Sequence, residues 1–468
     1  MPLRRFIHAS PLPVSAAAAF AWHARPGAFA RLSPPWAPAE LISETGAEKP
    51  GALEVGARKE IVMRTGPLRR HWIAEHTACQ PPDYFVDRQT AGPFKSWEHT
   101  HAFIPDGDGC KLEDRVEYQL PWGVLGDSFG ARYLGRELER VFNYRHAVTA
   151  GDLAAWKKYQ ESGTSPMKIL ISGASGLVGK ELTALLTTQG HEVVALVRER
   201  GASGIYWNPE GEGKPGELDR EALARAAPDA VVHLAGDNIA QGRWNDAKKA
   251  RIMDSRVKGT ALLAGALARM AKPPALFISA SAVGWYGDRG DEQLREASAP
   301  GDDFLARVCK AWEAACEPAC AKGIRTVNLR FGFILSPQGG GLAKLLLPFK
   351  LGGGGILGSG KQWMSWIALD DVAGAILHTL HTHALSGAVN TVAPHPVTNR
   401  EFTKTLGKVL GRPTILPMPA FAAKLAFGEM AEALLLASQR VSSDTLVNSG
   451  YTFRHPDLEG ALRFMLGK

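Results

Sequence analysis

Three glycines in the middle of the chain have the spacing of a phosphate-binding loop. They follow a GxxGxxG pattern directly after the apolar run at 168–172. Glycine at these positions permits a sharp turn out of a strand, a close approach of phosphate to the backbone, and tight packing of the next helix on the sheet. The N-terminus of that helix presents free N–H groups and a positive dipole end to the phosphates. The pattern predicts dinucleotide binding, with contacts from Gly173, Ser175, Gly176, Leu177, Val178 and Gly179.

The end of the next predicted strand indicates which dinucleotide is bound. Arg198 follows the strand at 192–197, where NAD-binding proteins place an acidic residue for the ribose hydroxyls. A guanidinium suits the additional 2′-phosphate of NADP. The expected cofactor is therefore NADP, with NAD as the less favoured alternative. A further strand at 230–235 ends beside the expected position of the adenosine and ribose, at Leu234, Ala235 and Gly236.

Strands and helices must alternate to bring these residues to one edge of a sheet. Residues 167–172 have the pattern of a strand, 177–189 that of an amphipathic helix, and 192–197 that of the next strand. Later apolar runs at 276–281 and 326–332 continue the alternation. This order is typical of an α/β Rossmann fold, which is a doubly wound parallel sheet.

The first 150 residues show a different pattern. Short runs of alternating polar and apolar residues are separated by turns rich in Pro, Gly and Asp, which predicts an antiparallel meander. A helical pattern follows from about Ala131 to Tyr159. His99 and His101 alternate on one strand, and we interpret them as polar strand positions rather than as a metal-binding pair. The expected strands are 62–64, 71–76, 84–88, 96–104 and 112–120.

Composition narrows the class of protein. A length of 468 residues with 45% hydrophobic and 22% charged residues is typical of two or three globular domains. The net charge of +7 is spread among acidic residues, so neither a nucleic-acid surface nor a membrane partner is expected. The five cysteines form no CxxC pair and no metal set, which fits a reducing compartment. The N-terminus resembles a signal peptide poorly, and no apolar run reaches the ~18–20 residues of a spanning helix. A cytoplasmic location is expected.

The order of motifs over about residues 167–410 resembles the extended short-chain dehydrogenase/reductase superfamily, which includes the nucleotide-sugar epimerases and dehydratases. More narrowly, the chain is similar to an atypical branch whose members are usually labelled epimerase-family proteins. Residues 411–468 resemble the C-terminal extension of that branch, which is expected to pack on the substrate side. The motifs that carry this resemblance are 237–244, 254–260, 309–313, 416–419, 442–444 and 450–453.

The N-terminal segment 1–160 resembles the START-like (SRPBCC) helix-grip fold, an α+β class. The resemblance rests on Trp97–Phe103, on Asp114–Tyr118 and on Phe142–Arg145 within the predicted long helix. It implies a sheet that curls around this helix and leaves an apolar cavity, with an apolar ligand as a possible partner. A polar linker is expected at 161–166, ahead of the Rossmann domain.

The resemblance also implies a catalytic set, in which a Tyr acts as acid and base, a Lys four residues later lowers the pKa of that Tyr and binds the nicotinamide ribose, and a Ser orients the substrate oxygen. Ser281 matches the Ser and Lys310 matches the Lys, but Ala306 stands at the Tyr position. Tyr286 is the candidate substitute, with a pKa that a neighbouring cation is expected to lower toward neutrality. The alternative is that Tyr286 is only a wall of the pocket.

Two functions from different classes follow from these residues. The first is an NADP-dependent oxidoreductase or epimerase-type enzyme with a displaced acid/base, acting on a small molecule. The second is a non-catalytic protein that senses NADP or binds an apolar ligand. Retention of Ser281, Lys310 and the glycine loop favours the enzyme, whereas the loss of the tyrosine favours the sensor.

Overall fold

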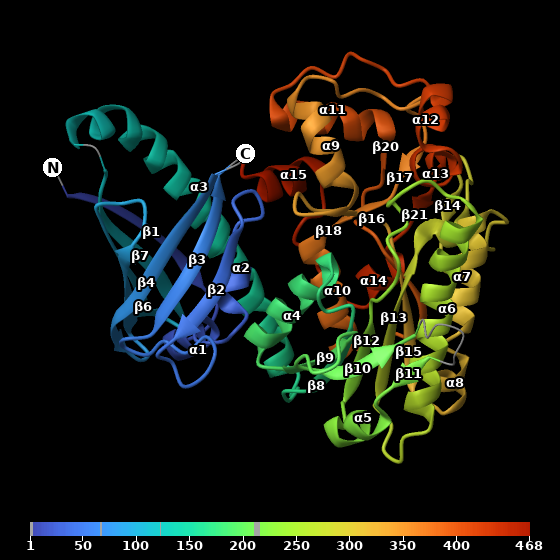
Figure 1. The fold of residues 1–468 in the computed structure, drawn as a ribbon, viewed down its shortest axis with the longest axis horizontal. Helices are drawn as coiled ribbons and strands as arrows, with labels where there is room; N and C mark the ends of the chain where they lie inside the picture. The colour runs from blue at the N-terminus through green and yellow to red at the C-terminus, as the bar shows by residue number, and fades with distance from the viewer. Residues whose placement is uncertain (1–2, 66–67, 122, 210–215) are drawn as a thin grey trace. The chain divides into compact units, whose positions relative to one another are not determined.

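The computed structural model describes residues 3–65, 68–121, 123–209 and 216–468 (Figure 1). The chain divides into two compact units. The first contains Met1–Pro166, Ala184–Gly190 and Phe464–Lys468, and the second contains Met167–Thr183 and His191–Arg463. Among the described residues, no helix combines the length and the apolar character needed to cross a membrane.

The first unit is an antiparallel sheet of seven strands with one long helix. The strand order is β1-β7-β6-β5-β4-β3-β2. The hairpins from β3 to β7 form the meander that the sequence predicts, whereas the sequence pattern predicts neither β1 nor β2. The elements are β1 (Arg4–Leu12), α1 (Ala16–His23), α2 (Ala28–Arg31), β2 (Ala39–Thr45), β3 (Arg58–Thr65), β4 (Leu68–Gln80), β5 (Tyr84–Ala91), β6 (Ser96–Asp106), β7 (Gly109–Gln119) and α3 (Gly123–Glu161).

Helix α3 covers the buried face of this sheet (Figure 1). Every second side chain of β6 and β7 is buried, as the period of a half-buried strand requires. Trp97 and Val116 from these strands pack against Leu138 and Phe142 of α3. This arrangement is the helix-grip fold that the resemblance implies.

A buried ion pair joins the two helices α2 and α3. The Nε atom of Arg31 donates to Asp152 Oδ2 at 2.9 Å, and its Nη2 donates to Asp152 Oδ1 at 2.7 Å. Both side chains are almost completely buried, with 1% and 0% of their surface exposed. Two charges withdrawn from water in this way require the bidentate geometry that they have here.

The second unit is a doubly wound sheet of eight strands in the order β11-β10-β9-β8-β12-β13-β15-β19. All neighbouring pairs are parallel except β10 and β11. Helices α6 and α7 lie on one side of the sheet and α10 on the other (Figure 1). The elements are β8 (Lys168–Ser172), β9 (Glu192–Val197), β10 (Ile205–Asn208), β11 (Glu217–Leu218), β12 (Ala230–His233), β13 (Leu276–Ala282), β15 (Arg325–Phe331), β19 (Gly387–Thr391), α4 (Leu177–Gln189), α6 (Asp246–Ala268), α7 (Phe304–Ala314) and α10 (Leu369–His381).

The strand order reverses at β8, which places the glycine loop at the point where ligands bind to such sheets. From β8 the chain adds β9 and β10 on one side and then returns to add β12, β13, β15 and β19 on the other. The crevice at the carboxyl ends of the strands opens at this reversal. The α/β Rossmann prediction is confirmed.

Part of the C-terminal segment of the second unit contacts the loop after β13. Strand β21 (Arg440–Val441) pairs with β14 (Gln293–Leu294), and Ser438 Oγ donates to the carbonyl of Gly290 at 2.6 Å.

The remaining elements after β8 lie between and beyond the strands of the parallel sheet. They are η1 (Val283–Tyr286), α5 (Arg220–Ala226), α8 (Glu317–Ala321), β16 (Phe333–Leu335), α9 (Gly340–Lys350), β17 (Trp363–Met364), β18 (Trp366–Ala368), β20 (Val397–Thr398), α11 (Asn399–Leu410), α12 (Ala420–Phe427), α13 (Glu429–Ala431), η2 (Glu432–Leu436), α14 (Asp444–Asn448) and α15 (Leu458–Leu466).

The buried pair between α2 and α3 gives a testable prediction. Asp152→Asn keeps the shape of the side chain but leaves the guanidinium of Arg31 buried without a counter-charge. We therefore expect the free energy of local unfolding of α3 to fall by about 3–5 kcal/mol. Amide exchange of α3 peptides in the full chain measures this loss. Glu117→Gln is the matched control, because its partner Arg5 is 65% exposed and the loss should stay below about 1 kcal/mol. Equal losses in the two variants would contradict the argument.

Candidate functional site

The glycine loop after β8 has a shape that only glycine permits at two positions. Gly173 has a φ of +74°, and a Cβ there would lie 2.9 Å from the backbone nitrogen of Ala235. A Cβ on Gly179 would lie 2.1 Å from the carbonyl oxygen of Gly173. Gly176 is exposed, and a Cβ there would lie 3.2 Å from the same carbonyl oxygen of Gly173. This cradle fits a pyrophosphate, as the sequence pattern predicts.

A hydrogen-bonded unit ties the loop to the end of β12. Ser172 Oγ accepts from the backbone nitrogens of Leu234 and Ala235 at 3.1 and 3.3 Å, and it lies 2.6 Å from His233 Nδ1. Burial, together with the nearby cation of Arg256, lowers the pKa of His233 to about 4. The imidazole is therefore neutral at physiological pH, and the structure brings Leu234 and Ala235 beside the glycine loop.

The other predicted cofactor contacts stand at the same edge of the sheet. Arg198 directly follows β9 and is exposed, and Gly236 is exposed after β12. Because β8, β9 and β12 are neighbouring parallel strands, their carboxyl ends meet at one edge. Ser175 is exposed, whereas Leu177 and Val178 are half-buried in the first turn of α4.

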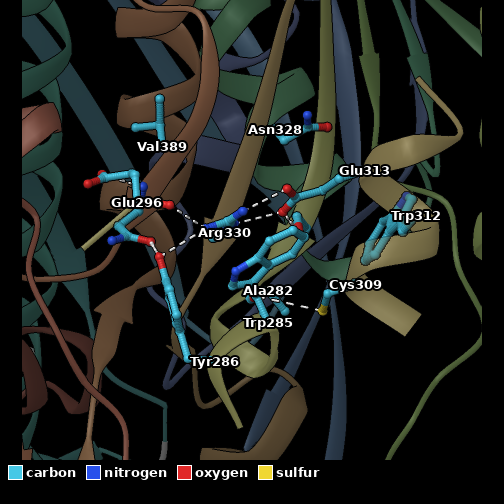
Figure 2. A network of polar contacts seen from close by, with 12 residues as sticks. Ala282, Trp285, Tyr286, Glu296, Cys309, Trp312, Glu313, Asn328, Arg330 and Val389 are labelled. Atoms are coloured by element: carbon cyan, nitrogen blue, oxygen red, sulfur yellow. Dashed lines mark hydrogen bonds and ion pairs between the residues drawn. The ribbon is translucent and has the colours of Figure 1, made fainter. Parts of the chain in front are cut away.

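A buried ion pair forms the centre of the candidate catalytic site (Figure 2). Arg330 on β15 donates from Nε to Glu313 Oε1 at 2.7 Å and from Nη2 to Glu313 Oε2 at 2.8 Å. Ser281, at the end of β13, donates its hydroxyl proton to Glu313 Oε1 at 2.6 Å. Burial by itself would lower the pKa of Arg330, but the hydrogen bond and the charge of Glu313 raise it. The three side chains form one continuous polar unit.

The opposite edge of the guanidinium holds the segment after β13. Arg330 Nη1 donates to Tyr286 Oη and to the carbonyl of Glu296, both at 3.1 Å. The guanidinium lies 3.8 Å above the ring of Trp285, and Tyr286 Oη donates to Asn390 Oδ1 at 2.6 Å. Figure 2 shows Arg330 lying between these groups and Glu313.

The expectation for the pKa of Tyr286 is wrong. Burial raises the pKa of this phenol, and the nearby cation of Arg330 lowers it by less than burial raises it. The side chain is completely buried, and its proton is held by Asn390. The phenol therefore keeps its proton at neutral pH, which supports a positioning role for Tyr286 beside Arg330.

The structure brings Ser281 together with Glu313 instead of Lys310. Lys310 is exposed on α7, and Ala306 is buried one turn earlier. Cys309, four residues before Glu313, lies with its sulfur 3.6 Å from the carbonyl of Ala282 on β13. The face of α7 toward β13 therefore carries a thiol and a carboxylate. The role of Lys310 in catalysis and ribose binding stays a prediction.

Glu313 and Arg330 were not predicted as site residues, although the sequence carries a signal for each. Glu313 closes the 309–313 motif, and Arg330 is a charged residue inside an apolar strand. A charge in a strand that is buried on both faces requires a partner. A search for the acidic partner of Arg330 could have found the pair.

Three family profiles match the chain. The NAD dependent epimerase/dehydratase family matches residues 169–391, and a domain of unknown function, DUF1731, matches residues 418–465. The polyketide cyclase/dehydrase and lipid transport family matches residues 12–142. These matches fit the second unit, its C-terminal segment and the first unit.

Individual relatives agree with these profiles. The epimerase family protein Mb2239 of Mycobacterium bovis is 43% identical over 298 residues, which are 63% of this chain and 96% of that protein. The crystal structure of a nucleoside-diphosphate sugar epimerase from Corynebacterium glutamicum is 34% identical with a TM-score of 0.79, and the match covers 99% of this chain and 90% of that one. Human epimerase family protein SDR39U1, solved with NADPH, is 34% identical with a TM-score of 0.58 over 64% of this chain and 99% of that one.

The fold, the glycine loop and these relatives define the class of the protein. The chain belongs to the NAD dependent epimerase/dehydratase family of extended short-chain dehydrogenases/reductases. It carries a polyketide cyclase-like domain in front and a DUF1731 segment behind.

The burial of Cys309 gives a prediction about thiol reactivity. Burial and the neighbouring Glu313 raise the pKa of Cys309 to about 12, whereas Cys320 is exposed. Because the thiolate is the reactive form, we expect iodoacetamide at pH 8 to alkylate Cys320 in the native chain and to leave Cys309 unmodified. Peptide mass spectrometry measures both, and Cys320→Ser should remove the rapid labelling. Labelling in urea, where all five cysteines should react, is the control. Rapid alkylation of Cys309 in the native chain would contradict the burial of its thiol.

Proposed function

We propose that the protein is an NADP(H)-dependent enzyme of the oxidoreductase or epimerase type that acts on a small molecule. The observation that carries the proposal is the buried chain Ser281–Glu313–Arg330, which begins at the carboxyl end of β13, the same edge that carries the glycine loop. The Ser281 hydroxyl donates to the Glu313 carboxylate, whose charge Arg330 balances. Such a hydrogen-bonded pair can transfer a proton.

The preference for NADP over NAD rests on Arg198 and on one relative. Arg198 is exposed directly after β9 and is followed by a further exposed Arg at position 200. The human relative that is 34% identical over almost its whole length was solved with NADPH. Residues that would hold the cofactor are Gly173, Ser175, Gly176, Leu177, Val178, Gly179, Arg198, Leu234, Ala235, Gly236 and Lys310.

The chain's own residues supply the proton transfer. A bound nicotinamide would give or take a hydride. Ser281 Oγ can accept a proton from a substrate hydroxyl while its own proton passes to Glu313 Oε1, 2.6 Å away. In the reverse direction the proton returns through the same two atoms. Arg330 compensates the charge of Glu313 through two hydrogen bonds, and Tyr286 positions Arg330.

The cofactor preference can be tested by calorimetry. We expect wild-type protein to bind NADPH more tightly than NADH, because a guanidinium at position 198 pairs with the 2′-phosphate. Arg198→Asp should weaken NADPH binding selectively, and Gly176→Val should weaken both because it fills the surface that the pyrophosphate approaches. Arg225→Asp, on an exposed helix face, is the charge-matched control. Tighter binding of NADH by the wild-type protein would contradict the proposal.

The proton path can be tested once turnover is found by screening carbonyl and sugar-nucleotide compounds for NADPH oxidation. Ser281→Ala should lower kcat by ~10²–10⁴-fold, the usual contribution of general acid/base catalysis, while NADPH affinity stays unchanged. Tyr286→Phe should lower kcat by less than about tenfold, because the phenol acts only by positioning Arg330. A larger loss in Tyr286→Phe than in Ser281→Ala would instead assign the acid/base to the phenol.

A second function is favoured by one observation, the buried Ala306 at the position of the usual tyrosine together with the exposed Lys310. These residues suit a protein that binds NADP(H) without turnover and reports it, with an apolar ligand in the polyketide cyclase-like domain. Tight NADPH binding with no oxidation by any compound of the screen would favour this function over the enzyme.

A further inference from the structure

The first unit contains a buried cluster of histidines and aspartates between its sheet and its helices. These polar side chains lie in the interior of the unit beside its apolar clusters. All are buried except Asp87, which is half-buried. The cluster consists of His23, His76, Asp87, His99, His101, Asp114 and His146.

His99 and His101 are polar positions on a strand, as expected, but their side chains face the interior of the unit. Alternate residues of β6 are buried, and the two histidines share the buried face with Trp97 and Phe103. The strand register explains why they meet the aspartates. His76 on β4 is directly opposite Asp87 on β5, and Asp87 is directly opposite His99.

Each of the two imidazoles lies between two carboxylates. On one side, Asp87 Oδ2 lies 3.6 Å from His99 Nδ1 and 3.3 Å from His101 Nε2. On the other side, Asp114 Oδ1 lies 2.9 Å from His99 Nε2 and 2.6 Å from His101 Nδ1. One ring nitrogen of each histidine therefore faces Asp87, and the other nitrogen faces Asp114.

The Asp87 side of this arrangement has the spacing of a metal site. Ligand atoms at ~2.0–2.1 Å from a tetrahedral ion lie roughly 3.3–3.4 Å apart, close to the 3.3 and 3.6 Å seen from Asp87 Oδ2. All three ligand atoms lie within 4.8 Å of one another. Among the described residues this is the one such group of His, Cys, Asp or Glu.

The Asp114 side has the geometry of an outer carboxylate. Histidines that bind a metal commonly donate the second ring N–H to a carboxylate, which fixes the tautomer and the ring orientation. Asp114 Oδ1 forms a hydrogen bond with His99 Nε2 at 2.9 Å and an ion-pair contact with His101 Nδ1 at 2.6 Å, and Asp114 Oδ2 accepts from His146 Nε2 at 2.7 Å. The ring of His146 is itself held by Ser10 Oγ, 2.6 Å from Nδ1. Asp114 is thereby fixed from α3 and β1.

We propose that Asp87, His99 and His101 bind one divalent transition-metal ion, with Asp114 as the outer carboxylate that orients both imidazoles. Two imidazoles and one carboxylate suit Zn²⁺ and its neighbours in the first transition row, and three protein ligands leave a position for water or an oxygen ligand. The Asp87 side chain is 18% exposed, and the two histidines are buried. His76 lies opposite Asp87 on the neighbouring strand, and its two ring nitrogens have no hydrogen-bond partner among the described residues.

The test uses the full chain purified without a metal-affinity tag. After dialysis against EDTA, the protein is titrated with Zn²⁺ and with Co²⁺, and metal content is measured by elemental mass spectrometry. We expect one ion per chain and visible Co²⁺ absorption typical of low coordination number. Asp87→Asn and His101→Gln should lose this ion. His71→Gln is the matched control, because His71 is exposed on β4 and its loss should leave one ion bound.

A second variant distinguishes the residues that bind the ion from the residues that only position Asp114. His146→Gln removes a partner of Asp114 but no ligand, so it should bind one ion with ~10–100-fold weaker affinity. Thermal unfolding of each variant checks the fold. If the ligand variants do not fold, X-ray absorption of the Zn²⁺-loaded wild-type chain decides the question, because it must show two imidazole ligands. Absence of stoichiometric binding, absence of imidazole ligation, or unchanged binding in Asp87→Asn would overturn the proposal and leave a metal-free hydrogen-bonded network.

Discussion

The candidate site of the second unit depends on one buried ion pair, Glu313 with Arg330. Two charges taken out of water are stabilised only when all of their hydrogen-bonding positions are satisfied. The pair is bidentate and gains further hydrogen bonds from Ser281 on β13, Tyr286 on η1 and the carbonyl of Glu296. The same contacts fix the segment after β13 in one conformation. Removal of either charge would therefore affect the shape of the site as well as its chemistry.

The sequence predicts those features that local geometry or period determines. Gly173 and Gly179 are predictable because only glycine satisfies their backbone conformation or contacts, and the parallel sheet follows from the alternation of strands and helices. The Glu313–Arg330 pair was not predicted, because its two residues lie on separate elements, α7 and β15, that only the fold brings together. The pKa of Tyr286 was mispredicted because burial competes with the nearby cation, and burial is known only from the fold.

The two candidate sites arrange their buried polar groups in different ways. In the second unit, each buried charge of the site has one dominant opposite charge. In the first unit, a single carboxylate, Asp114, is shared by His99, His101 and His146. Shared partners couple the histidines, so a change at one ring alters the others. The period of β6 could have shown that His99 and His101 face inward, but only the register across β5, β6 and β7 shows what they meet.

The pairing of β14 with β21 has a consequence for synthesis of the protein. The loop that follows η1 is held by residues 438–441, which come far later in the chain. A ribosome adds roughly 5–20 residues per second, and domains generally fold as they emerge. The glycine loop and most of the parallel sheet can therefore form on the nascent chain, whereas the loop beside Arg330 must wait for this late segment. The site is consequently completed at a late stage of translation, after the surface that would bind the cofactor.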